Sequence, residues 1–324
     1  MGQSDTIKRS EGRDIRCQVT AITKQSVAYD LNGQPAQISA GEIQYIEFDD
    51  EPADIGRARL RLDNGQFADC LTELQKVAFG SLSPPLQAEH AYLRAKAETK
   101  KAMIDGTSTT REAATAVGEA LRSFADSYHY YDLLNDFGTL AFHTGEMAVA
   151  EKSFQELASC GIPSFSLNGS LQLARVYLEQ AKPAEAQEAL TQVLQSSATD
   201  NFAQDAKLIA RCLAARVQAA EGNADAGIAQ IEQIIANEDS ERKRVFASCY
   251  NSLGLCHLSL DDPRSARMDL LHTDLLYASE GDLHAEALYY LADIWTRLGE
   301  TDRALRDKQI LSQRYRNTYW ANKK

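Results

Sequence analysis

The sequence lacks the features by which several large classes of protein are recognised. No apolar run reaches about 18 residues, so no transmembrane helix is expected. The GxGxxG, Walker, GxSxG and HExxH signatures are absent, which argues against the cofactor-binding and hydrolytic enzymes that carry them. Basic charge is also in deficit. With 34 Lys and Arg against 46 Asp and Glu, the net charge of −12 disfavours nucleic acid and anionic lipid as partners.

Cysteine and histidine are too scattered to indicate a metal site. The six cysteines form no CxxC pair, so we expect them to pack as small apolar residues, with disulfides or reactive thiols as the alternatives. No two of the six histidines are three or four positions apart, as one helix face would need to hold a metal. We interpret Cys256, His257 and His272 as packing or surface residues of a repeat. No catalytic residue, metal or cofactor is predicted.

The first fifty residues have the pattern of short strands. Ile15, Cys17 and Val19 alternate with polar residues, as in a half-buried strand. Asn32-Gly33 follows a second alternating segment and is a strong hairpin signal. We expect four or five strands in a small SH3- or Sm-like β domain over residues 1–52. So small a sheet has little core of its own, so we expect it to rest on the following segment.

The pattern changes at the acidic segment Asp49-Asp50-Glu51. Ala- and Leu-rich stretches with short polar breaks follow it, as in successive helices, and Pro52 suits the first turn of the first one. We interpret the three acids as a solvated linker. A ligand-sensing or enzymatic site at this junction is a minor alternative, although three adjacent acids lack the looped spacing that calcium requires.

The helical region repeats itself. A small residue recurs at intervals of 36 to 41 positions where a second helix would cross a first: Ala150, Ala186, Gly227, Ala266 and Ala304. These intervals are typical of helical repeats, in which small residues allow close crossing and large ones fill the space between adjacent pairs. A shorter copy precedes them, and a less regular helix pair is expected from Leu86 to Phe124. We therefore expect residues 53–324 to form six to seven helix pairs.

Two copies carry further matches. The segments "YNSLGLCHLSLDDPRSARMDLL" (250–271) and "LYYLADIWTRLGETDRAL" (288–305) hold the Leu-Gly, aromatic, Gly and Ala positions of a consensus repeat. On these residues the chain resembles tetratricopeptide repeat proteins from about Ala53 to Tyr315. It departs from them in its longer spacing and in lacking the Pro at repeat ends. The resemblance implies a mainly α fold, an α-solenoid that winds as a right-handed superhelix of helix pairs.

The final segment gives a preference about location. "LSQRYRNTYWANK" (311–323) is similar to the last-repeat tail of bacterial envelope repeat proteins, including outer-membrane assembly lipoproteins. That resemblance favours the periplasm or envelope, with a signal peptide removed before Met1. Six cysteines without an evident pairing, and no visible signal peptide, favour the cytoplasm instead.

The first helices of the pairs would line the inner surface of the superhelix. In the frame set by the Gly and Ala positions, six residues face inward and are the candidate partner-binding residues: Asn135, Arg175, Arg216, Asn251, Tyr289 and Asp293. Arg and Asn there can hold a partner's carboxylate or backbone. Solvated polar residues without a partner are the alternative at each position. The Lys/Asn clamp for C-terminal carboxylates found in some tetratricopeptide repeat proteins is not recognisable.

These observations predict a non-enzymatic scaffold or adaptor that binds a partner protein or peptide through its repeat surface. The first alternative is a permanent structural subunit of a larger assembly, for example in the envelope. The second is a ligand-sensing or enzymatic site at the junction near Asp49–Glu51. The absence of catalytic motifs makes the scaffold the leading hypothesis.

Overall fold

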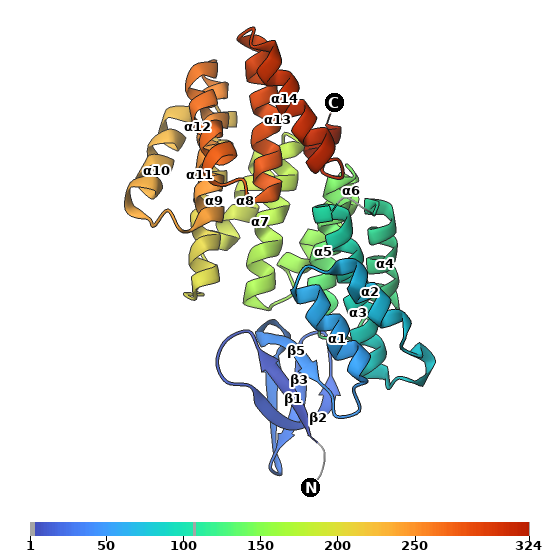
Figure 1. The fold of residues 1–324 in the computed structure, drawn as a ribbon. Coiled ribbons are helices and arrows are strands. Elements are labelled where there is room, and N and C mark those ends of the chain that lie inside the picture. Colours follow the sequence, from blue (N-terminus) through green and yellow to red (C-terminus); the bar gives the residue numbers. More distant parts are fainter. Residues whose placement is uncertain (1–3, 106–107, 324) are drawn as a thin grey trace. The chain divides into compact units, whose positions relative to one another are not determined.

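The computed structural model describes residues 4–105 and 108–323 (Figure 1). The chain divides into two compact units. Unit 1 comprises residues 1–141 and 159–166, and unit 2 comprises residues 142–158 and 167–324. The division into domains of residues 1–52 and 53–324 stays a prediction.

A five-stranded antiparallel sheet begins unit 1. Its strands are β1 (Asp5–Arg9), β2 (Ile15–Ile22), β3 (Ser26–Leu31), β4 (Gln34–Ser39) and β5 (Ile43–Glu47). They pair in the order β4-β3-β2-β1-β5, so a four-stranded meander is completed by a last strand that returns beside the first. Asn32 and Gly33 both have positive φ angles, of 56° and 85°, between the paired strands β3 and β4. The two-residue hairpin predicted from Asn-Gly is confirmed.

The sheet rests on the helical part of unit 1, as its size predicts. Its own core is small, with Ile7, Val27 and Ile46 fully buried. The Ile46 amide donates a hydrogen bond to the Tyr128 hydroxyl at 3.2 Å. A Cβ on Gly41 would lie 2.6 Å from Ile162 Cγ2, so the chain there packs backbone against side chain.

The helices of unit 1 begin directly after the junction. They are α1 (Ala53–Asp63), α2 (Phe67–Gln75), α3 (Pro84–Lys100), α4 (Thr110–Ser123) and the first part of α5 (Tyr130–His143). A π-helical turn, Lys101–Asp105, extends α3. Thr109 caps α4, and its side chain accepts a hydrogen bond from the Glu112 amide. The Glu112 side chain in turn accepts one from the Thr109 backbone N–H. The less regular helix pair expected from Leu86 to Phe124 is therefore present.

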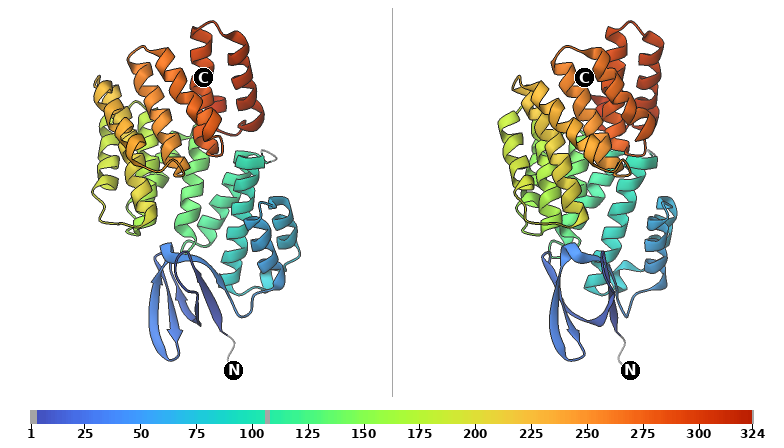
Figure 2. Two further views of the ribbon diagram at one scale, coloured as in Figure 1. Left: turned by 60° about the vertical axis from the view of Figure 1, so that its left-hand side comes forward. Right: turned by 90° about the vertical axis from the view of Figure 1, so that its left-hand side faces the viewer.

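Unit 2 consists of helices in regular succession. They are α6 (Met147–Ala158), α7 (Pro163–Glu179, from Leu167 onward), α8 (Pro183–Leu194), α9 (Asn201–Ala220), α10 (Ala224–Asn237), α11 (Lys243–Ser259), α12 (Pro263–Leu276), α13 (Gly281–Arg297), α14 (Thr301–Arg314) and α15 (Tyr319–Asn322). Figures 1 and 2 show α9 to α14 as neighbouring antiparallel pairs. The first helices α9, α11 and α13 contact one another in turn.

One geometric feature recurs in the helix pairs. Three-residue links join the helices, and their middle residue has a left-handed backbone: Gly65, Gly145, Ala181, Gly222, Asp261 and Gly299. Five positions after each of these lies a buried small residue: Cys70, Ala150, Ala186, Gly227, Ala266 and Ala304. A Cβ on Gly227 would lie only 2.8 Å from the Ala215 carbonyl oxygen, so the two helices cross closely. The repeat frame inferred from sequence is thereby confirmed.

Candidate partner-binding surfaces

Three of the six residues expected to bind a partner come together in unit 2. Arg175 on α7, Arg216 on α9 and Asn251 on α11 line one cavity, together with Glu286 on α13 and Arg244 on α11. Each lies on a first helix, as predicted. The cavity has a volume of about 40 Å³. That is room for a few water molecules at most, far below the size of a small-ligand pocket.

The donor groups of Arg216 and Asn251 contact acceptors inside unit 2, whereas the buried Asn251 Oδ1 has no hydrogen-bond partner among the described residues. Arg216 Nη1 lies 3.0 Å from Glu286 Oε1, and its Nη2 lies 3.6 Å from Glu179 Oε1. Asn251 Nδ2 donates to Glu286 Oε2 at 3.0 Å and to the Leu283 carbonyl oxygen at 2.9 Å. Asn251 is only 1% exposed. Both residues therefore hold α13 against the preceding first helices.

A second carboxylate organises the other end of the cavity. Asp282 on α13 accepts a hydrogen bond from Arg175 Nη1 at 3.0 Å and two from Arg244, at 3.1 Å each. Burial alone would raise the pKa of Asp282, but the guanidinium groups of Arg244 and Arg175 outweigh it and hold that pKa well below its usual value. Asp282 is therefore ionised at neutral pH and binds both cations.

Partner binding by these residues stays a prediction, and the acids that Arg175, Arg216 and Asn251 contact were not predicted from the sequence. Three arginines of this cavity pair with three acids, Glu179, Asp282 and Glu286, so most of the charge there is paired inside unit 2. Sequence analysis did not single out Asp282 and Glu286. Their partners are up to 107 positions away in the chain, and no local pattern signals such contacts.

Tyr289 and Asp293 lie at a different hollow of unit 2. This hollow has a volume of about 340 Å³ and is also lined by Lys308, Trp320 and Lys323. The Asp293 side chain is 48% exposed and pairs with Arg297 at 2.7 Å. The sixth predicted residue, Asn135, is half-buried on the part of α5 that belongs to unit 1.

The acidic junction is only partly a solvated linker. Asp49 and Asp50 are exposed, but each of the two carboxylate oxygens of Glu51 accepts a hydrogen bond from the Arg59 guanidinium, at 2.9 Å in both cases. Arg59 also contacts Glu89, whose buried carboxylate accepts from Tyr128 and lies 2.7 Å from His129 Nε2. The interpretation of Glu51 as solvated is therefore wrong. Its carboxylate neutralises an arginine that is buried between the sheet and the helices of unit 1.

Although burial opposes ionisation, His129 and Arg59 lower the pKa of Glu89 to about 2. Glu89 thus serves as an ionised anchor for Arg59 at neutral pH. A hollow of about 310 Å³ beside this group is lined by Tyr45, Glu51 and Arg59. The Arg59 guanidinium lies over the Tyr45 ring at 4.5 Å. These contacts account for the charged side chains at the junction as parts of the fold.

Cys256 and His257, on α11, have the environment of packing residues. His257 Nδ1 lies 2.7 Å from Asp269 Oδ2, and Trp295 Nε1 donates to Asp307 Oδ2 at 3.0 Å. Both contacts join a first helix to its second helix twelve positions later, so the two rings occupy equivalent sites in successive repeats. Within residues 4–105 and 108–323, no group of three His, Cys, Asp or Glu could hold a metal ion.

An apolar surface that sequence analysis missed lies on α12. Met268, Leu275 and Leu276 are 52%, 71% and 63% exposed. Met268 and Leu275 are seven positions apart, two helical turns, and therefore share one face. The opposite face of α12 packs through the fully buried Ala266 and Leu270. The seven-residue spacing of Met268 and Leu275 is present in the sequence, but the repeat frame identifies only the buried residues of α12.

The described helices include none that is both long and apolar enough to cross a bilayer. Comparison with known protein families finds no matching family model. No curated protein matches the sequence either.

Solved structures do resemble this one. A tetratricopeptide repeat protein from Parabacteroides merdae ATCC 43184 superposes with a TM-score of 0.58 and 15% identity, over 81% of this chain and 92% of that chain. A Rap protein complexed with competence and sporulation factor gives a TM-score of 0.48 at 11% identity, over 83% and 76% of the two chains. The apo form of RapI gives 0.43 at 11% identity, over 84% and 76%. TM-scores below 0.5 support no conclusion about this chain.

The Parabacteroides protein bears on the fold alone, because its identity with this chain is low. The links, the buried small residues and this similarity agree. The chain has a tetratricopeptide-repeat-like helical fold, preceded by a small five-stranded antiparallel sheet.

Proposed function

We propose that this protein is a non-enzymatic scaffold that binds a partner protein through the outer face of α12. The observation that supports the proposal is the exposure of Met268, Leu275 and Leu276 on one helix. Single exposed apolar residues are common, but a group on one helix face is typical of an interaction surface. Met suits such a surface because its flexible thioether adapts to different partners.

These three side chains lie outside the buried cluster that α12 forms with α13. The α12–α13 interface is filled by Ala266, Leu270, Leu291 and Trp295. Arg264, one turn before Met268, is also exposed and adds a charge beside the apolar group. The partner that fits this surface presents an apolar helix face or loop with an acidic edge.

Partner binding by the six residues predicted on the inner surface stays a prediction. Arg175, Arg216 and Asn251 already donate hydrogen bonds to Asp282, Glu286 and a backbone carbonyl. Arg175 Nη2 and Asn251 Oδ1 are buried without a hydrogen-bond partner among the described residues. A ligand carboxylate would first have to displace an internal carboxylate that lies at hydrogen-bond distance from the same arginine. Little net affinity is therefore expected. This is why we place the interaction surface on α12 instead.

The test is a comparison of three forms of the protein as bait in its native cells. The Leu275→Asp variant should lose the proteins that wild type captures, because a charge would be buried in the interface. The control Gln233→Asp changes an exposed residue of α10 and should capture the same proteins as wild type. Both variants should fold normally, as circular dichroism and melting can show. Identical capture by wild type and a folded Leu275→Asp variant would refute the proposal.

The same material separates an adaptor from a permanent subunit. A scaffold with exchanging partners gives a protein that is partly free in size-exclusion chromatography of a native extract. A permanent subunit elutes only at the size of its assembly. The surface proposed on α12 is required in either case, so the Leu275→Asp comparison remains decisive for the surface itself.

A further inference from the structure

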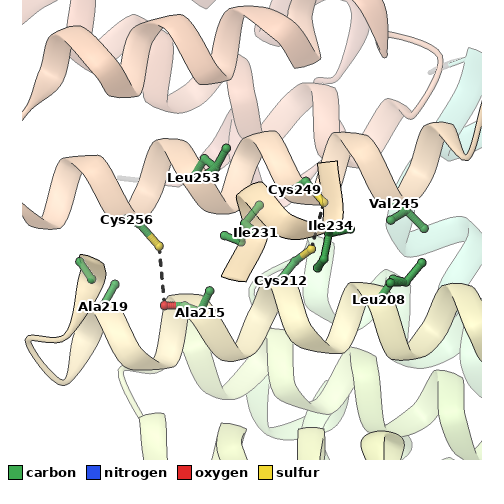
Figure 3. Packing of buried hydrophobic residues seen from close by; sticks show 11 residues of the cluster. Leu208, Cys212, Ala215, Ala219, Ile231, Ile234, Val245, Cys249, Leu253 and Cys256 are labelled. Atoms are coloured by element: carbon green, nitrogen blue, oxygen red, sulfur yellow. Dashed lines mark hydrogen bonds between the residues drawn. The ribbon is translucent and has the colours of Figure 1, made fainter. Parts of the chain in front are cut away.

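Two cysteine thiols from neighbouring repeats touch in the core of unit 2. Cys212 lies on α9 and Cys249 on α11, and their sulfur atoms are 3.2 Å apart (Figure 3). Both residues are fully buried. Their surroundings are apolar and include Leu208, Ile234 and Val245. Neither thiol therefore has a metal-binding or catalytic partner in this cluster.

The third cysteine of the cluster is arranged differently. Cys256 is also on α11 and fully buried, but its Sγ points to the Ala215 carbonyl oxygen, at 3.6 Å. Figure 3 shows it two turns along α11 from Cys249. The cluster thus contains one thiol pair and one single thiol of similar burial, which supplies a matched internal control.

We propose that Cys212 and Cys249 are an oxidation site at which a reversible disulfide joins α9 to α11. In the reaction the two thiols lose two protons and two electrons and one S–S bond forms. Hydrogen peroxide can accept them and become two water molecules, or a small disulfide can accept them and become two thiols. Because a disulfide bond is about 2.0 Å long, the sulfurs must approach by about 1 Å.

Burial controls how fast this reaction can occur. The hydrogen bond with Cys249 and burial raise the pKa of Cys212 well above its ordinary value. The thiolate is the reacting form, so the closed fold reacts slowly. Oxidation should proceed through a transient opening of the α9–α11 contact, and should therefore accelerate at higher pH and in low denaturant concentrations.

The bond would have a mechanical consequence. It would close a loop that runs from Cys212 through α10 to Cys249, and would link two successive repeats covalently. A cross-link over a loop of this length restricts the unfolded chain strongly. We expect the melting temperature of the oxidised protein to exceed that of the reduced protein by at least about 5 °C.

The experiment compares wild type with two variants after treatment with hydrogen peroxide or oxidised glutathione in mild denaturant. Wild type should lose two hydrogen masses, and digestion should give one peptide that links the segments holding Cys212 and Cys249. Cys256→Ala should behave identically. Cys249→Ala should neither form the link nor gain thermal stability. Reductant should reverse the change in wild type.

Two results would overturn the proposal. One is that both thiols can still be alkylated completely after oxidant treatment. This test applies under conditions in which a maleimide labels both thiols, which shows that the α9–α11 contact opens. The other is a loss of two hydrogens that maps to another pair or persists in Cys249→Ala. Should Cys249→Ala fail to fold, the linked peptide from Cys256→Ala and wild type still decides the question.

Discussion

Arg216 illustrates how a residue can lie on the expected helix and still have its partners inside the protein. Its position on a first helix follows from the repeat frame, and an inward-facing arginine suggests a partner carboxylate. The structure gives it two internal carboxylates, Glu286 and Glu179, and a side chain that is only 10% exposed. Such an arginine is a structural ion-pair residue whose loss leaves buried acids without a counter-charge.

We therefore predict that Arg216→Ala lowers the free energy of unfolding by about 3 kcal/mol, because it leaves the buried Glu286 carboxylate without a counter-charge. Urea unfolding followed by circular dichroism measures this. Arg297→Ala is the matched control. Its side chain is 55% exposed and pairs with the exposed Asp293, so a change below about 0.5 kcal/mol is expected. A loss below about 1 kcal/mol for Arg216→Ala would show that its ion pairs contribute little.

Asp307 should make the stability of the protein depend on pH. Burial, and then the nearby Asp274, raise its pKa to about 6, against 3.8 for the ordinary group. The folded protein thus holds this proton more tightly than the unfolded chain does. The stability that it contributes is complete below about pH 4 and is lost as the pH rises through about 6.

Asp307→Asn should therefore be more stable than wild type at pH 7.5, by about 2 kcal/mol, and nearly equal to it at pH 4. Asn can still accept the hydrogen bond from Trp295 Nε1. Urea titrations of both proteins at the two pH values give the difference. The exposed Asp293→Asn serves as control and should stay close to wild type at both. A difference that does not grow with pH would contradict this role for Asp307.

At the scale of the helix pairs, the link residues carry the sharpest backbone constraint. Four of the six left-handed positions are Gly, whereas Ala181 and Asp261 adopt φ angles of 56° and 57° with a side chain present. A left-handed backbone costs an L-residue roughly 1–2 kcal/mol, and Asp tolerates it better than Ala. The link between α7 and α8 therefore carries strain that the four glycine links avoid.

Ala181→Gly should raise the free energy of unfolding by about 1 kcal/mol, because glycine removes the strain at this link. The same chemical change at Ala229, exposed in the interior of α10, should lower it by about 1 kcal/mol. Thermal and urea unfolding of both variants measure the two effects. Opposite signs are the expected result, and a destabilising Ala181→Gly would mean that chain entropy outweighs backbone strain at this link.

At the scale of unit 2, a lysine near the end of the described chain joins α15 to helices far away in the sequence. Lys323 Nζ lies 2.7 Å from Glu179 Oε2 at the end of α7. It also lies 4.8 to 5.7 Å from the centres of four rings: Tyr289, Tyr290, Tyr319 and Trp320. Attraction between a cation and aromatic rings adds to the ion pair when both are partly desolvated. One lysine thus fastens α15 to α7 and α13.

Lys323→Ala should loosen α15, because the ammonium that joins Glu179 to the ring cluster is lost. Trypsin cleavage after the exposed Arg316, just before α15, should become several times faster than in wild type. Lys323→Arg keeps the charge and the ring contacts and should restore most of the protection. Equal cleavage rates in wild type and Lys323→Ala would show that the packing of Trp320 alone holds the segment.

Local patterns in the sequence were sufficient for the fold. Asn32-Gly33 predicts the hairpin because its backbone needs positive φ angles, and Ala266 and Ala304 mark helix crossings because only small residues fit there. Such signals depend on neighbours within one or two helices. The chain therefore determined by itself the small sheet, the helix pairs and the placement of Arg175, Arg216 and Asn251 on first helices.

Only the tertiary structure decided which side chains Arg175, Arg216 and Asn251 contact. Arg175 meets Asp282 across 107 positions of sequence, and Lys323 meets Glu179 across 144. No periodicity specifies contacts at such separations, because they depend on how much each repeat turns relative to the last. The exposure of Met268, Leu275 and Leu276 on α12 likewise became visible only in the structure.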